Sequence, residues 1–112
     1  MSKSKAVSHM AEQSPLFPVG KLVITEGVHK LVAEGKITPK IYFERHARGD
    51  WGDMPMEDLC QNDYMVHRRG RLMSSYLVDE KITLWALSEP DRMQTLLLLP
   101  DEYWPAAAFQ DL

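Results

Sequence analysis

The residues of this chain that could do chemistry are concentrated between His46 and Asp63. The segment opens with the sequence His-Ala-Arg-Gly-Asp-Trp-Gly-Asp, which ends at Asp53. It holds a cluster of carboxylates: Asp50, Asp53, Glu57, Asp58 and Asp63. From Gly49 to Tyr64 no Lys or Arg offsets their charge. Because glycines beside an aromatic residue are typical of an unusual backbone path, we expect a specifically shaped loop with an acidic surface.

A metal-dependent hydrolase is one chemistry that these side chains could support. His46, Asp50 and Asp53 carry nitrogen and oxygen donors at close spacing, with Asp63 and His67 further along the chain. The paired His or Cys spacing of zinc sites and the alternating acids of a calcium loop are both missing. The alternative is that Asp50 and Asp53 accept backbone N–H bonds in turns and at a helix start. We therefore expect neither a metal nor another cofactor.

Nucleophilic catalysis has weaker support. Cys60 falls on the apolar stripe of an expected helix, where a cysteine is usually an inert core residue. Ser74 and Ser75 lie within an expected strand, without the sharp glycine-flanked turn of a serine nucleophile. The sequence offers no catalytic set of residues, and it favours a non-enzymatic protein.

Nucleic-acid binding is suggested by one basic cluster, which contains Arg68, Arg69 and Arg71. Three arginines in four positions could hold phosphate. The alternative is that they cap a helix C-terminus and pair with nearby acids. The formal net charge of −3 gives no general attraction to nucleic acid, so direct binding is not expected.

Trp51 is the strongest candidate for a functional residue. A large amphipathic ring between two Gly-Asp units can plug the core beneath the loop. It can instead project as an anchor in a protein interface. Both roles stay open from the sequence, and the loop is built around the ring in either case.

The elements that must position these residues follow from hydrophobic periodicity. Residues 1–14 form a polar arm, and residues 20–25 a β-branched strand. Helices are expected over 26–34 (capped by Thr25 and stopped at Gly35), over 39–48 (capped by Thr38), and from Pro55 to just before Gly70. The third helix should bury a stripe of Met56, Leu59, Cys60 and Tyr64. After Gly70 the period changes to two, which predicts a three-stranded antiparallel meander up to Leu99.

This order predicts an α+β domain over residues 15–104, with three helices packed on one face of a small, mostly antiparallel sheet and a C-terminal tail over 105–112. The last meander strand is apolar on both sides, which predicts a central position or a covered second face. Self-association is one way to protect such a sheet. No apolar run approaches the ~20 residues of a membrane span. With a single cysteine and no signal peptide, a cytoplasmic location is expected.

Several segments together resemble a family of small bacterial proteins carried by plasmids, integrative elements and prophages. The resemblance covers residues 16–103, with the Gly-Asp-Trp-Gly-Asp element as its most specific part. Its other segments are residues 16–20 with Thr25 and Gly27, Glu57-Asp58, Asn62-Asp63, and residues 71–76, 88–92 and 98–103. Some members are labelled as a type I restriction-modification subunit. That label does not fit this chain, which lacks a methyltransferase's glycine-rich loop, its Asn/Asp-Pro-Pro-aromatic motif and its length.

The resemblance implies an accessory protein of a mobile element and carries no catalytic residues across. We expect a module that binds a host or mobile-element protein with a basic surface. Interference with host defence, by anti-restriction or anti-CRISPR action, is one concrete version. The expected binding residues are Asp50, Trp51, Asp53, Glu57, Asp58 and Asp63.

Overall fold

The computed structural model of the protein describes residues 15–103 and 109–111. In chain order the elements are β1 (Lys21–Thr25), α2 (Glu26–Ala33), α3 (Pro39–Ala47), α4 (Met56–Arg68), β2 (Leu72–Asp79), β3 (Ile82–Ser88), β4 (Gln94–Leu98), the 3-10 helix η1 (Pro100–Glu102) and β5 (Phe109–Asp111). The predicted α+β class is confirmed, with the three α-helices before Gly70 and the meander after it.

The strands form one five-stranded sheet in the order β2-β3-β4-β1-β5. Strands β2, β3 and β4 pair antiparallel as a meander, and β5 pairs antiparallel with β1. Strand β1 pairs in parallel with β4, so β4 is the central strand, as its apolar sequence predicted. Strand β5 lies within the segment that the sequence analysis assigned to the C-terminal tail.

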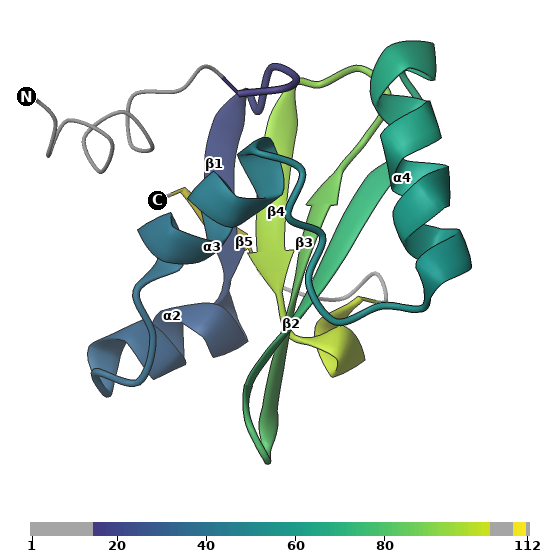
Figure 1. The fold of residues 1–112 in the computed structure, drawn as a ribbon. Coiled ribbons are helices and arrows are strands. Elements are labelled where there is room, and N and C mark those ends of the chain that lie inside the picture. Colours follow the sequence, from purple (N-terminus) through teal and green to yellow (C-terminus); the bar gives the residue numbers. More distant parts are fainter. Residues whose placement is uncertain (1–14, 104–108, 112) are drawn as a thin grey trace, which may run out of the picture.

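The three α-helices cover one face of the sheet (Figure 1). Side chains of α2, of α3 and of the segment between them form a buried apolar cluster with the strands beneath; its members are Ile24, Val28, Ile37, Phe43, Tyr76, Leu84, Ala86 and Leu97. A second buried cluster lies on the other face, from Val23, Leu87, Leu96 and Leu98. A third buried cluster, of Phe17, Trp51 and Leu72, packs against α4. Burial of apolar surface at about 25 cal/mol per Å² makes these three clusters the main source of stability.

The helix ends follow the predicted signals with one exception. The Thr25 hydroxyl caps α2 by accepting from the amide of Val28 at 3.3 Å. Helix α4 ends at Arg69, whose φ of 56° is the left-handed cap before Gly70. Thr38 is the N-cap of α3 as predicted, but its side chain makes no capping hydrogen bond and its backbone carbonyl accepts from the amide of Ile41.

The predicted buried stripe of α4 is wrong in three of its four positions. Met56 is 72% exposed, Tyr64 is 51% exposed, and Cys60 is an exposed free thiol. Only Leu59 of the stripe packs inward, and the helix turns the side chains of Asn62, Met65 and Val66 toward the sheet. The hydrophobic pattern missed this face because its most buried member, Asn62, is polar.

Candidate functional site

The loop from Gly49 to Asp53 lies along the outer edge of β2. Gly49 and Gly52 both have φ of +84°, which confirms the unusual backbone path expected around Trp51. The carbonyl of Trp51 accepts from the amide of Ser75 at 2.9 Å, and the amide of Asp53 donates to the Ser75 carbonyl at 2.6 Å. Because a Cβ at Gly52 would lie 2.1 Å from the Ser75 oxygen, only glycine permits this approach.

Two side chains extend this closure along β2. The Asp53 carboxylate accepts from the amide of Leu77 at 2.9 Å. On the other side of the loop, the side-chain amide of Asn62 donates to the Met73 carbonyl at 2.8 Å and accepts from the Met73 amide at 3.3 Å. An open edge strand is a template for unwanted pairing, and here much of the edge is occupied by the protein's own groups.

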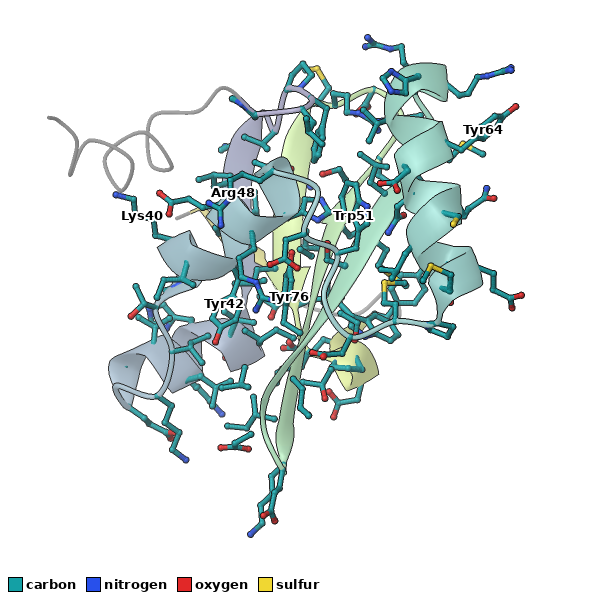
Figure 2. All side chains as sticks on the ribbon, in the orientation of Figure 1. Lys40, Tyr42, Arg48, Trp51, Tyr64 and Tyr76 are labelled. Atoms are coloured by element: carbon teal, nitrogen blue, oxygen red, sulfur yellow. The ribbon has the colours of Figure 1, made fainter. Side chains whose placement is uncertain are left out.

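Trp51 lies in the core between the sheet and α4 (Figure 2), with only 3% of its surface exposed. Its ring stacks on Phe17 at a centroid distance of 6.2 Å and meets the edge of His46 at 5.4 Å. The indole N–H donates to the Asp63 carboxylate at 2.9 Å. Of the two roles left open by the sequence, this placement is that of a core residue beneath the loop. The indole N–H connects the ring to the acidic surface through Asp63.

His46 is fully buried in a chain of hydrogen bonds. Its Nδ1 lies 2.6 Å from the Ser74 hydroxyl and its Nε2 lies 3.0 Å from the Ser88 hydroxyl. Ser88 in turn lies 2.8 Å from the Thr95 hydroxyl, which donates to the carbonyl of Val19 at 2.7 Å.

The last bond in this chain sets the direction of the others. Because the Thr95 proton goes to a carbonyl, Ser88 must donate to Thr95 and accept from His46 Nε2. His46 Nε2 therefore carries a proton, and in the neutral ring Nδ1 accepts from the Ser74 hydroxyl. Burial, together with the positive charge of Arg92, lowers the pKa of His46 to about 3, which agrees with a neutral ring.

The structure does not bring His46 together with Asp50 and Asp53 as a ligand set. Both ring nitrogens of His46 are occupied by hydroxyl groups, whereas the two carboxylates bond elsewhere. Among the described residues, no group of three or more His, Cys, Asp or Glu side chains could hold a metal ion. The serines that bond His46 are themselves buried, so this Ser–His contact is part of the core.

Asp50 is tied to the end of α3. It accepts two hydrogen bonds from the guanidinium of Arg45, at 2.6 and 3.2 Å, and one from the amide of Gly52 at 3.2 Å. The hydrogen bond from Arg45 holds the pKa of Asp50 below its ordinary value, so the carboxylate stays ionised. The backbone carbonyl of Asp50 accepts from the hydroxyl of Tyr76. The Arg45 guanidinium lies over the ring of the same tyrosine. Asp50 therefore keeps a negative charge while it fixes the loop.

Glu57 and Asp58 differ from the other acids of the segment. Both are exposed in the first turn of α4, and within residues 15–103 neither carboxylate makes a hydrogen bond or ion pair. Beside them an open hollow of about 320 Å³ separates α4 from the loop, lined by Gly49, Asp50, Trp51, Gly52, Met56, Leu59, Cys60 and Asp63. Of the five acids, Asp50 and Asp63 line this depression.

The basic cluster at the other end of α4 is partly used by the fold. Arg71 forms an ion pair with Glu89 at 3.0 Å and donates to the Tyr103 hydroxyl at 2.6 Å. Arg68 lies over the ring of Tyr64 at 4.7 Å. The left-handed Arg69 supplies the C-cap of α4, as expected for the alternative to phosphate binding.

Two residues that the sequence analysis did not single out hold the site in place. Arg92 is 5% exposed and donates to the carbonyls of Met65, Gly70 and Glu89, which fixes the C-terminal end of α4. Asn62 binds β2 as described above. A buried polar side chain inside a helix or turn leaves no periodic signal, so neither role could be read from the pattern.

Searches of protein-family models, curated proteins and solved structures find no match to this chain. Within the part of the chain that the structure describes, no helix is long and apolar enough to cross a bilayer.

Proposed function

We propose that this protein is a non-enzymatic protein-binding module that docks a basic partner through its acidic surface, formed by Asp50, Asp53, Glu57, Asp58 and Asp63. The observation that carries the proposal is the state of Glu57 and Asp58. Both carboxylates are exposed and lack an internal partner among the described residues, so the fold accounts for their charge only through its interaction with the positive end of the α4 dipole. Segment 49–64 contains no Lys or Arg to neutralise them.

The remaining acids are held rigidly at their places. Asp50, Asp53 and Asp63 each accept at least one hydrogen bond from the protein and retain acceptor capacity toward a partner. Fixed charges lose little conformational entropy on binding, which favours a specific complex. Trp51 supports the surface from beneath by positioning Asp63, and we assign it a positioning role.

The family resemblance gives the proposal its context. A mobile-element accessory protein meets host proteins, and proteins that bind nucleic acid carry the basic surfaces that an acidic surface fits. We therefore place the partner among host or mobile-element proteins of this class, with anti-restriction or anti-CRISPR action as the concrete version. Neither rival chemistry has comparable support, since His46 is enclosed in the core and Arg71 is paired with Glu89.

The test compares affinity capture from a bacterial host lysate by the wild-type chain and by an Asp53→Asn/Asp58→Asn variant. Asparagine at position 53 keeps an acceptor for the Leu77 amide, so the fold should be preserved. A Glu80→Gln variant, altered at the exposed hairpin tip, is the matched control. The proposal expects a protein with a basic surface that is retained by the wild type and the control and lost from the double variant. Equal retention by all three would overturn it.

A further inference from the structure

Helix α4 presents an apolar stripe to solvent, and the N-terminal part of this stripe borders the hollow beside the Trp51 loop. We define the α4 stripe as Met56, Cys60 and Tyr64, which recur every four residues and so share one helix face. Met56 is 72% and Tyr64 51% exposed, and Tyr64 points away from the sheet (Figure 2). Single exposed apolar side chains are ordinary, but a row of them along one helix marks an interaction surface.

Charges of opposite sign stand at the two ends of this stripe. Glu57 is in the first turn of α4, and Arg68 is in the last turn. Eleven residues separate them, which is close to three full turns, so both lie on the same flank of the stripe and about 16 Å apart along the axis. The helix thus carries an acid at one end and a base at the other, beside an apolar centre.

We propose that the α4 stripe binds the α4 stripe of a second copy of this chain, with the two helices antiparallel. The two-fold axis of such a pair runs perpendicular to both helices. It reverses the helix direction and keeps the flank that carries Glu57 and Arg68 on the same side of the dimer. Glu57 of one copy therefore meets Arg68 of the other, twice in each dimer. A parallel pair would instead bring Glu57 to the level of Glu57 of the other copy and Arg68 to the level of Arg68, so no opposite charges would meet. The charge pattern is self-complementary only in the antiparallel arrangement, as a closed two-fold contact requires.

The centre of such a contact is apolar. With Glu57 opposite Arg68 of the second copy, Cys60 packs near Tyr64 of the second copy, and the two Cys60 thiols flank the two-fold axis. One helix face buries less than the ~1,200 Å² typical of stable complexes, so the dimer forms in a concentration-dependent equilibrium. The self-association considered in the sequence analysis would protect the sheet. The contact proposed here is different, because helix α4 makes it.

This inference goes beyond the proposed function and shares one acid, Glu57, with the acidic surface. The dimer engages Glu57 and Arg68, whereas Asp53 and Asp58 lie outside the stripe and stay accessible. The Asp53→Asn/Asp58→Asn variant should therefore dimerise like the wild type even where it loses its partner. Failure of the dimer and failure of the acidic docking surface are distinguishable for that reason.

Sedimentation equilibrium over a range of concentrations tests the dimer by charge reversal. Glu57→Arg and Arg68→Glu alone should each weaken self-association at least tenfold, because each creates two like-charge contacts. The double variant Glu57→Arg/Arg68→Glu should restore it to near the wild-type constant. Glu80→Arg makes the same charge change at the hairpin tip and should have no effect.

Cross-linking with a short bismaleimide provides a second readout, because wild-type Cys60 is exposed. A covalent dimer should form readily with the wild type and the double reversal, and slowly with either single reversal. A wild-type chain that stays monomeric at every concentration would overturn the proposal. Self-association that is indifferent to the single reversals, or that the double reversal does not restore, would also overturn it.

Discussion

Asn62 binds Met73 as a neighbouring strand would, through one donor and one acceptor on the same side-chain amide. The pairing joins α4 to the outer edge of β2 and occupies both backbone groups of Met73. The loop at Trp51 and Asp53 binds both backbone groups of Ser75 and the amide of Leu77. The acidic segment is therefore anchored along the sheet edge, which fixes where its free carboxylates point.

Replacing Asn62 with Ala should destabilise the fold by about 2 kcal/mol, because two hydrogen bonds to buried backbone are lost together. Urea unfolding measures the change. Gln61→Ala on the exposed side of the same helix is the control and should change stability by less than about 0.5 kcal/mol. Equal stability of the two variants would mean that the edge closure contributes nothing.

Trp51→Ala should cost about 3–5 kcal/mol, as expected when a large aromatic side chain is removed from a core. The contrasting variant is Tyr64→Ala, which removes an exposed ring and should leave the free energy of unfolding nearly unchanged. Thermal or urea unfolding of both variants checks this contrast. A Trp51→Ala protein as stable as the wild type would contradict the core-plug role.

Gly52 and Gly35 provide a matched pair for backbone strain. Both have positive φ, but a Cβ at Gly35 meets nothing within 4 Å, whereas at Gly52 it would strike the Ser75 carbonyl. Gly35→Ala should cost about 1 kcal/mol from its φ alone. Gly52→Ala should cost clearly more, because β2 and the loop must separate. Similar unfolding free energies for the two variants would show that the loop does not need its close approach to β2.

The pH dependence of stability should carry the signature of His46. Its folded pKa of about 3 lies below the ordinary value of 6.5, so only the unfolded chain takes up this proton between those values. The stabilisation is present above pH 6.5 and is lost as the pH falls, with a slope of up to about 1.4 kcal/mol per pH unit.

Denaturant unfolding between pH 7 and 4.5 measures this slope. His46→Gln should flatten it, whereas His29→Gln, at an exposed position of α2, should not. An NMR titration of the wild type is the companion measurement, and the His46 ring signals should not shift in this range. A His46 that titrates near pH 6.5 would contradict the buried neutral ring.

Much of the fold could be predicted from sequence because its signals are local. Glycines, prolines and the change of period at Gly70 set the helices and the meander. The parallel pairing of β1 with β4 could not be predicted, because the two strands lie about seventy residues apart in the sequence. Their apolar side chains also resemble those of the other strands, so the pattern does not identify the partner. The face of α4 was misjudged because Asn62, and not Cys60, is turned toward the sheet.

The candidate site was predicted as a segment but not as a geometry. The loop path followed from Gly49 and Gly52, yet the partners of its acids are distant in sequence. Asp53 bonds Leu77, and His46 bonds Ser74 and Ser88. Such contacts depend on the finished tertiary structure, so composition alone could not separate acids that hold the fold from Glu57 and Asp58.

The most direct test of the docking proposal is the association rate of the captured partner, measured by stopped flow or surface plasmon resonance against ionic strength. The wild type should associate fast at low salt and slow steeply as salt rises, because a charged surface steers encounter. The Asp53→Asn/Asp58→Asn variant should associate at least several-fold more slowly, with a flatter salt dependence. Identical rates and salt slopes for the two proteins would contradict the proposal that the acidic surface docks the partner.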